Sequence, residues 1–390
     1  MGLLTKSELV EALKQAKGDN DVAAEILDCG TRTIERYKKI FGLSNTKVGK
    51  ELITPSASIH RDTKVVNLTH KLKQNEEKYQ IVCEENQDLK ELLEIAKKID
   101  VSNSYTIKPL KPLNKNHLVT AVALASDWHY EETVHPANVN HKNEYNTSIA
   151  KQRAEAFFIS TVRLYNIFRK ESKIDNLILA LLGDFINGQL REEAMESNSM
   201  RPMDATLQCW QILTAGIKYI LDNTDLNLII PCHSGNHART TVKTHPITEA
   251  GNSLEYLMYH QIAASFAGNK RVQFIIPTSY HSYITINDFV IRFHHGHAMR
   301  YSGGIGGIYI SVNKAIAQWN KVQRADLDVF AHFHQMKDGG NFICNGSLIG
   351  WNEFANWIKA DYEKPKQAFF LIDHERKEKT VTAPIFLQYK

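Results

Sequence analysis

Pairs of metal-binding side chains, two residues apart, recur in this 390-residue chain. Asp127 and His129 directly follow one apolar run, and His332 and His334 follow another. In an extended chain, residues i and i+2 point to the same side, so each pair can present two ligands to one space. Carboxylate and imidazole groups are common ligands of divalent metals. The spacing therefore predicts two parts of one metal site.

A further candidate ligand, Asp184, lies in the segment 176–188, NLILALLGDFING. The six apolar residues before Gly183 predict a buried strand, because the run is too short for a helix of that hydrophobicity. Gly183 then allows the backbone to turn tightly. Asp184 is left at the carboxyl end of the strand, where open α/β sheets place their ligands.

Two more apolar runs end in ligand-type residues. Asn236 and His237 follow the run 226–232, and His295 closely follows the run 289–293. One such junction is usually only a turn. Five junctions of the same kind, each with the apolar strand first and the metal-type ligand second, indicate a shared site.

The candidates together comprise two carboxylates, one amide and four imidazoles: Asp127, Asp184, Asn236, His129, His295, His332 and His334. This set is too large for one tetrahedral zinc and suits two metals that share a bridging carboxylate. Two anionic ligands against two dications leave a net positive charge, which attracts phosphate and lowers the pKa of a bridging water. The absence of thiolates from the set favours manganese, iron or magnesium over a structural zinc.

The ordered motifs D-x-H, G-D-x-x-N-G, G-N-H, H-G-H and H-x-H resemble those of the calcineurin-like metallophosphoesterases. The resemblance covers residues 118–350 and implies that family's α/β fold, a four-layer αββα sandwich. The segments Gly235–Arg239 and Asn345–Gly350 look closest to phage-type metallophosphoesterases and repair exonucleases. The implied cofactors are two divalent ions, with manganese as the first candidate and iron, magnesium or zinc as alternatives.

The resemblance also assigns a role to each motif position. One metal would be held by Asp127, His129 and His334. The other would be held by Asn236, His295 and His332. Asp184 would bridge the two, and a metal-bound hydroxide would attack phosphorus in line. His237 would donate to the phosphoryl oxygens or protonate the leaving group.

Several positions depart from the family's pattern or stay open. Asn187 stands where many relatives carry a second Asp, and Ala331 stands where the last motif usually has Gly. Arg239 stands near a position where Asp or Glu is common, and it is either a bidentate phosphate clamp or a surface arginine. The H-G pairing favours His295 as the ligand, although the sequence does not separate it from His297. His297 would otherwise contact substrate.

Residues 1–50 predict a small domain of the helix-turn-helix type. Thr5-Lys-Ser-Glu8 has the form of a capping box at the start of the first helix. A second short helix is predicted over 22–27, and Thr31 is predicted to cap a third. Short helices joined by a Gly-containing turn are typical of a helix-turn-helix.

The predicted third helix is rich in basic side chains: Arg32, Arg36, Lys38 and Lys39. These residues predict contact with DNA. The alternative is a solvated basic face on a protein-interaction module. The formal net charge of +4 is too small to name a partner by itself.

The remaining chain divides into linkers, a long helix and the catalytic domain. Linkers are predicted over 51–62 and 101–117, and the catalytic domain over 118–390. Apolar residues within 63–100 keep the three-and-four spacing of a heptad, which predicts a coiled coil and a homodimer. The alternative is a single helix packed along its own catalytic domain.

The sequence predicts a protein without a membrane anchor. Its five cysteines are odd in number and contain no C-x-x-C pair, which argues against a disulfide framework and a zinc finger. The N-terminus is polar, and no apolar run approaches the ~20 residues that span a bilayer. A cytoplasmic location is therefore predicted.

Three functions compete at this point. The sequence favours a two-metal phosphodiester hydrolase, specifically a DNA nuclease, because a predicted DNA-binding domain precedes the metal site. A nucleotide or small-molecule phosphodiesterase, or a phosphatase, would use the same ligands. A DNA-binding regulator with a silent phosphoesterase fold is the third candidate, and the intact ligand set argues against it.

Overall fold

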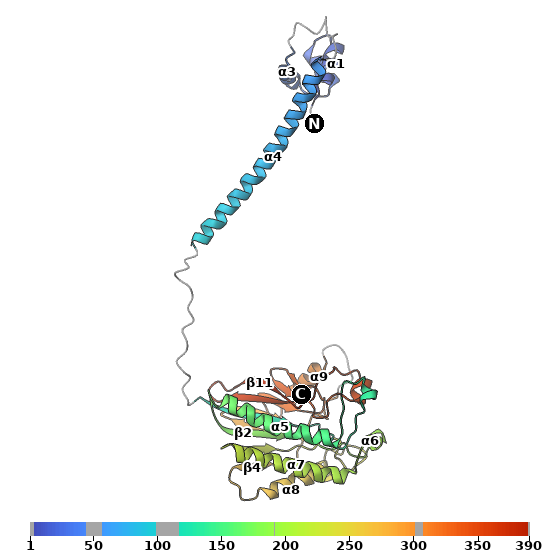
Figure 1. Cartoon of the computed structure of the whole chain (residues 1–390), viewed down its shortest axis with the longest axis vertical. Coiled ribbons are helices and arrows are strands. Elements are labelled where there is room, and N and C mark those ends of the chain that lie inside the picture. The colour runs from blue at the N-terminus through green and yellow to red at the C-terminus, as the bar shows by residue number, and fades with distance from the viewer. Residues whose placement is uncertain (1–3, 44–56, 99–116, 191, 301–306, 389–390) are drawn as a thin grey trace. The chain divides into compact units, whose positions relative to one another are not determined.

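A computed structural model shows that the chain divides into two compact units (Figure 1). The structure describes residues 4–43, 57–98, 117–190, 192–300 and 307–388. One unit is Met1–Lys108 and the other is Pro109–Lys390. The predicted linkers, 51–62 and 101–117, lie mostly outside the described residues.

Three short helices form the N-terminal part of the first unit: α1 (Lys6–Gln15), α2 (Asn20–Ile26) and α3 (Thr31–Ile40). The predicted capping box is present, because Thr5 and Glu8 each accept the other's backbone N–H. A small core holds the helices together, with Leu9, Leu13 and Ile34 fully buried. The N-cap of α3 is Gly30, however, and the Thr31 hydroxyl instead donates to Asp21 Oδ1 of α2 over 2.7 Å.

The long helix α4 runs from Ala57 to Lys98, so it begins before the predicted residue 63. Its predicted heptad positions lie open to solvent. Seven apolar side chains on that seam are between 49% and 71% exposed: Val65, Leu68, Leu72, Tyr79, Val82, Leu89 and Leu93. No described helix is both long and apolar enough to span a membrane.

Two β-sheets form the centre of the second unit. The first has the order β11-β10-β1-β2-β3-β4. Its strands are β1 (Leu118–Ala125), β2 (Lys173–Leu181), β3 (Asn227–Pro231), β4 (Val272–Ile275), β10 (Lys366–Asp373) and β11 (Glu378–Phe386). Strands β1 to β4 are parallel, and β10 pairs antiparallel with β1.

The second sheet has the order β5-β6-β7-β9-β8. Its strands are β5 (Ser282–Ile286), β6 (Phe289–Phe293), β7 (Leu327–Phe330), β8 (Lys337–Asp338) and β9 (Phe342–Cys344). Strands β6, β7 and β9 are parallel, and β5 and β8 pair antiparallel at the two edges.

Helices cover the outer faces of both sheets. The longer ones are α5 (Thr147–Phe168), α7 (Pro202–Asn223), α8 (Leu254–Ser265) and α9 (Ile308–Trp319). The short ones are α6 (Glu192–Ser197), α10 (Glu353–Trp357) and the 3₁₀ turns η2 (Pro136–Val139) and η3 (Ala250–Asn252). Helices α5, α7 and α8 cover the first sheet, and α9 covers the second (Figure 1).

Two apolar layers show how these parts pack. Phe157 and Leu213, from α5 and α7, are buried with Leu179 of β2 on the outer face of the first sheet. Ile178 of β2 is buried with Ile291 of β6 between the sheets. Successive residues of β2 thus face opposite layers, as the strand pleat requires. The predicted two sheets with helices outside are confirmed.

Candidate metal centre

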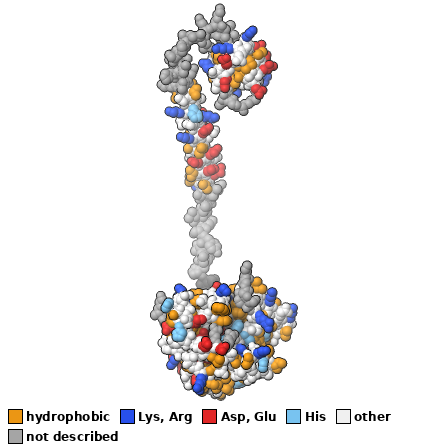
Figure 2. Space-filling model, turned by 90° about the vertical axis from the view of Figure 1, so that its right-hand side faces the viewer, with side chains coloured by type: hydrophobic (Ala, Val, Ile, Leu, Met, Phe, Trp, Pro, Cys, Tyr) orange, Lys and Arg blue, Asp and Glu red, His pale blue; other side chains and the backbone are white. Residues whose placement is uncertain are grey.

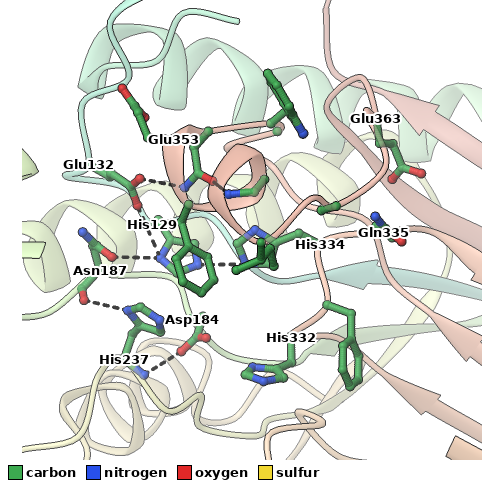
Figure 3. A pocket seen from close by; sticks show the side chains of 18 of the residues that line it. His129, Glu132, Asp184, Asn187, His237, His332, His334, Gln335, Glu353 and Glu363 are labelled. Carbon is green, nitrogen blue, oxygen red and sulfur yellow. Dashed lines mark hydrogen bonds and ion pairs between the residues drawn. The ribbon is translucent and has the colours of Figure 1, made fainter. Parts of the chain in front are cut away.

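Every predicted metal ligand follows the carboxyl end of a strand. Asp127 and His129 follow β1, Asp184 follows β2 and Asn236 follows β3. The second sheet contributes the rest, with His295 after β6 and with His332 and His334 after β7. Because these ends meet where the two sheets adjoin, the side chains converge in one place. Figure 3 shows four of them, His129, Asp184, His332 and His334. Asp127 and Asp184 are at most 1% exposed there.

The first cluster joins Asp127, His129 and His334, whose ligand atoms all lie within 4.8 Å of one another. His334 Nε2 is 3.2 Å from His129 Nε2 and 3.4 Å from Asp127 Oδ1. Asp127 Oδ2 accepts hydrogen bonds from the Ser126 hydroxyl and from the His332 backbone N–H. Asp127 Oδ1 is buried and, apart from the 3.4 Å contact with His334 Nε2, has no hydrogen-bond partner among the described residues. A bound cation would satisfy that oxygen.

The second cluster joins Asp184, His295 and His332 at the same spacing. His295 Nε2 lies 3.0 Å from Asp184 Oδ2 and 3.3 Å from Asn236 Oδ1, which brings the predicted amide ligand into this cluster. Asp184 also groups with His129 of the first cluster and with His237. One carboxylate therefore reaches both clusters, as a bridging ligand must.

Hydrogen bonds to the outer ring nitrogens turn two ligand imidazoles toward the centre. His295 Nδ1 donates to the Leu182 carbonyl oxygen over 2.6 Å. His129 Nδ1 lies 3.1 Å from Asn187 Oδ1, and Asn187 Nδ2 donates to Asn198 Oδ1, which fixes the amide's orientation. Since these oxygens accept, each Nδ1 carries a proton, and Nε2 is the ring atom that faces the centre.

His237 lies against both clusters without joining the predicted ligand set. Its Nδ1 donates to the Asn187 carbonyl oxygen over 2.9 Å, and its ring centre is 4.6 Å from that of His129. Figure 3 shows its backbone held by Asp184. Its Nε2 is thus the ring atom that can accept or give a proton.

The ligands stand on backbone that is unusual for side-chain-bearing residues. Five of them have left-handed φ angles: Asp127 (52°), His129 (47°), Asp184 (54°), His332 (74°) and His334 (56°). Each such residue costs on the order of 1–3 kcal/mol and persists only where the surroundings enforce it. The fold therefore holds these side chains in place rather than letting them relax.

Two glycines allow the loops after β2 and β3 to meet. Gly183 has a φ of 88°, and a Cβ there would collide with the backbone of Gly235. A Cβ on Gly235 would in turn collide with the Asp184 carboxylate. The glycines of the G-D and G-N-H motifs are thus needed so that Asp184 and Asn236 can face one centre.

The pKa shifts of the metal-free protein differ among the candidate ligands. Burial lowers the pKa of His129, and His237 and His334 lower it further, so the imidazole is neutral. Burial raises the pKa of Asp184, but the charges of His295 and His237 outweigh it and hold the pKa well below its usual value. Neutral imidazole and ionised carboxylate are the forms that coordinate a cation. Burial lowers the pKa of His295, but the charges of Asp184 and Asp127 outweigh it and raise the pKa to about 9, so metal binding there displaces a proton.

No protein-family model matches the chain, and no curated protein matches its sequence. It is similar to the solved structure of a predicted phosphoesterase from Streptococcus pneumoniae, at 12% identity over 65% of this chain and 84% of that one, with a TM-score of 0.26. It is also similar to zinc-complexed Vps29 from Entamoeba histolytica, at 10% identity over 68% and 99%, with a TM-score of 0.25.

A third similar structure is a 5'-nucleotidase from Candida albicans, at 12% identity. The match covers 71% of this chain and 53% of that one, with a TM-score of 0.29. With identities and scores this low, the chemistry of this chain has to come from its own side chains.

Two buried glutamates that the sequence did not single out brace the loop after β2. Glu255 of α8 accepts the backbone N–H groups of Phe185 and Gly235, over 2.6 and 2.8 Å. Burial, together with the charge of Asp184, raises the pKa of Glu255 to about 8. In the sequence, the signal that could have identified Glu255 is an acidic residue inside the apolar stretch LEYLMY.

The second of these residues is Glu131, which accepts the N–H groups of Asn187 and Gly188, each over 2.9 Å. Burial raises its pKa to about 7. Glu131 lies two residues after His129, so it joins the loop after β1 to the loop after β2. No spacing rule identifies it from sequence, because its partners are backbone groups of another segment.

The predicted substrate contacts have other partners in this structure. The Arg239 guanidinium donates to the backbone carbonyl oxygens of Asn236, Thr241 and Val242, which braces its own loop. His297 Nε2 lies 2.7 Å from Glu249. Of the two histidines that the sequence left open, His295 joins a ligand cluster and His297 joins none of those found among the described residues.

The four predicted DNA contacts on α3 divide into two groups. Arg32, Arg36 and Lys39 are exposed. Lys38 is only 5% exposed, and its Nζ donates to Asn20 Oδ1 of α2 over 2.8 Å. Lys38 therefore links two helices of the domain, and only the other three basic side chains are open to a phosphate.

A cleft of about 1470 Å³ opens onto the centre (Figure 3). The residues at the centre that line it include Asp184, His237 and His334. The innermost side chains of the two clusters are buried, so a substrate reaches the clusters through this cleft. The cleft belongs entirely to the second unit.

Proposed function

We propose that the chain is a metal-dependent phosphodiester hydrolase that uses two divalent ions. The observation that carries this proposal is the meeting of two ligand clusters at one carboxylate, Asp184, on the floor of an open cleft. The buried Asp127 oxygen without a hydrogen-bond partner among the described residues supports occupancy by a cation.

The chain's own residues would divide the work as follows. Asp127, His129 and His334 would hold one ion, and Asn236, His295 and His332 would hold the other, with Asp184 able to reach both. When bound, two divalent ions would supply positive charge for a phosphate and lower the pKa of a bound water. The absence of thiolates from the ligand set favours manganese, with iron, magnesium and zinc as alternatives.

His237 is placed to handle the proton of the leaving group. The Asn187 carbonyl oxygen holds the proton on Nδ1, so Nε2 is the atom that faces substrate chemistry. Protonated at Nε2, the imidazole can donate to the oxygen that leaves phosphorus. Asn187 contacts both His129 and His237, and so it positions a ligand and this proton donor together.

We further propose DNA as the substrate, which makes the protein a nuclease. The support is the exposed basic set Arg32, Arg36 and Lys39 on α3 in the same chain as the metal centre. Phosphate contacts by such side chains provide most of the non-specific affinity for nucleic acid. A small-molecule phosphodiesterase would need no such set.

The test measures how fast the full-length chain, loaded with Mn²⁺, Fe²⁺, Mg²⁺ or Zn²⁺, hydrolyses each of four substrates. They are labelled single- and double-stranded DNA, bis-p-nitrophenyl phosphate and p-nitrophenyl phosphate. We expect cleavage of DNA and of the small diester, bis-p-nitrophenyl phosphate. The monoester, p-nitrophenyl phosphate, should be cleaved more slowly. Hydrolysis of neither diester by protein that holds two metal ions would refute the proposal. Cleavage of the small diester alone would favour a small-molecule phosphodiesterase.

A further inference from the structure

Aromatic side chains line the cleft beside the metal centre, and Phe333, Tyr309 and Phe354 are here called the aromatic wall. Phe333 lies between the ligands His332 and His334 in sequence, and its ring centre is 5.2 Å from that of His332. Tyr309 of α9 and Phe354 of α10 also line the cleft and are 40% and 45% exposed. Exposed aromatic faces beside a catalytic centre are surfaces on which flat ligands stack.

The polar side chains beside the aromatic wall are mainly amides and carboxylates. Asn138 and Glu353 line the cleft together, with Asn138 Nδ2 donating to Glu353 Oε1 over 3.2 Å. Gln335 lies beside the ligand His334. Figure 3 shows Glu353 and Gln335 around the centre, and Figure 2 shows hydrophobic and acidic side chains next to each other on this unit.

Lysine and arginine are nearly absent from the lining of the cleft. Among the described residues that line it, the basic side chains other than histidine are Lys337 and Lys359, and Lys337 Nζ lies 3.7 Å from Asp361. A groove that follows the phosphodiester backbone is lined by Lys and Arg. This wall therefore suits a neutral part of a substrate and not its phosphates.

We propose that the wall binds unpaired nucleobases beside the phosphate that is cut, so that the substrate is a single strand. Bases present flat faces for aromatic rings, and amino and ring groups on their edges for carboxylates and amides. This combination is the one found in and beside the wall. The inference rests on the proposed hydrolase function and specifies its substrate.

Duplex DNA cannot use such a wall, because its bases are stacked on one another and their edges are paired. A base reaches an aromatic wall only when it is unpaired or turned out of the helix. The cleft, at about 1470 Å³, also exceeds the ~300–1,000 Å³ of typical small-ligand pockets. It has room for more than one nucleotide.

The deciding experiment uses Phe354→Ala, with Trp357→Ala as its matched control. Both aromatics belong to α10, but Trp357 is 83% exposed and is not among the described residues that line the cleft. The Mn²⁺-loaded full chain is given a short DNA strand, the same strand with abasic sites and the corresponding duplex. The quantity compared is kcat/KM for the base-containing strand divided by kcat/KM for the abasic strand.

We expect the wild-type chain to prefer the base-containing strand over both the abasic strand and the duplex. Phe354→Ala should lower that preference by about 5- to 150-fold, the range set by base–aromatic stacking. Trp357→Ala should leave it unchanged, and Phe354→Trp should restore it. An RNA strand of the same sequence reports whether the sugar is also recognised, and the inference predicts the same base dependence on RNA if RNA is cut.

Equal rates on the base-containing and abasic strands would overturn the inference, as would a duplex cut as fast as the single strand. An equal effect of the two alanine variants would also overturn it. If bis-p-nitrophenyl phosphate is hydrolysed in these cases, only the base-binding wall is wrong. If no diester is hydrolysed at all, the proposed function itself has failed.

Discussion

His237 and Asp184 are joined directly, because the backbone N–H of His237 donates a hydrogen bond to Asp184 Oδ1 over 2.8 Å. The other carboxylate oxygen, Oδ2, lies 3.0 Å from His295 Nε2. The same side chain thus fixes the loop that carries the proposed proton donor and contacts a ligand from the second sheet. Changes at Asp184 should therefore affect both metal ions, whereas changes to the His237 ring should affect neither.

Asp184→Ala should abolish diester hydrolysis and lower the metal content. It removes one of two anionic ligands and the only one shared between the proposed ion sites. Loss of a residue that merely supports a ligand costs about 10–100-fold, so loss of the shared ligand should cost at least ~100-fold. The measurements are bound metal by elemental analysis and turnover of bis-p-nitrophenyl phosphate.

The control for that variant is Asp175→Asn. Asp175 belongs to the same strand but pairs with Lys173 at the strand's start. The Asp175→Asn variant should keep full metal content and full activity. A folded Asp184→Ala protein with wild-type turnover would show that the two clusters are not a shared centre.

His237→Ala should retain both metals and lose turnover. The ring's role lies in proton transfer, for which a positioned side chain typically contributes about 10²–10⁴-fold. The backbone hydrogen bond to Asp184 survives the substitution, because the N–H is unchanged. Loss of metal together with activity would mean that His237 is itself a ligand, in line with its place beside His129 and Asp184.

In the metal-free protein, the contribution of Glu131 to stability should fall as the pH rises above about 4.5. Burial raises the pKa of Glu131 to about 7 from the ordinary 4.5 of an unfolded chain. Folding therefore favours the protonated carboxyl, and its contribution to stability is present below pH ~4.5 and is lost as the pH rises through ~7. Glu131→Gln, which cannot ionise, should flatten this part of the pH profile.

Urea unfolding with chelator present, between pH 4.5 and 8, measures this effect. The comparison concerns the slope with pH, since Gln also replaces one of the oxygens that accept the N–H groups of Asn187 and Gly188. Glu171→Gln, at an exposed site, should leave the slope unchanged. An identical slope in the Glu131→Gln protein would show that this carboxyl does not titrate in that range.

The convergence of the candidate ligands was predictable because each follows an apolar strand of recognisable length, and parallel strands end at one edge. The two-residue spacing nevertheless does not work through an extended backbone, as the sequence had suggested. Asp127 and His129 have left-handed φ angles of 52° and 47°, so a turn and not an extended chain brings them together. Sequence spacing identified the residues but not the conformation that aims them.

Other features depend on contacts between distant segments, which no local pattern reveals. Lys38 has the sequence character of a DNA contact, yet Asn20 of a neighbouring helix binds it. Strand β11 contains Pro384, which argues against a strand, but it lies at the sheet edge, where proline is tolerated. Glu131 and Glu255 bind backbone N–H groups that only the folded chain brings to them.

We propose that α4 forms a homodimer through its exposed heptad seam. Leu72 and Leu89 of that seam are 60% and 56% exposed in the single chain, and pairing with a second copy would bury them. The full-length protein should sediment as a dimer, and Leu72→Glu with Leu89→Glu should make it a monomer. Ile81→Glu is the control, because Ile81 is 55% exposed but lies off the seam. A wild-type monomer at micromolar concentration would contradict the proposal.

The DNA contact of the N-terminal domain should depend on the exposed basic residues of α3. Each phosphate that they neutralise releases counterions, so log K_obs falls with log[salt] by about 0.9 per contact on duplex DNA. Replacing Arg32, Arg36 and Lys39 with Ala should weaken binding and flatten the salt slope by up to about 2.7. Lys38→Ala should instead destabilise the domain, since Lys38 is buried and bonded to Asn20.

Lys14→Ala with Lys17→Ala provides the matched control, because these lysines are exposed on and just after α1. Their loss should change the net charge but leave the salt slope close to that of the wild type. Turnover of bis-p-nitrophenyl phosphate should be equal in all variants that fold, because the small diester needs only the metal centre. If the α3 triple variant keeps the wild-type salt slope, the helix is not the DNA contact. The nuclease proposal would then rest on the cleft alone.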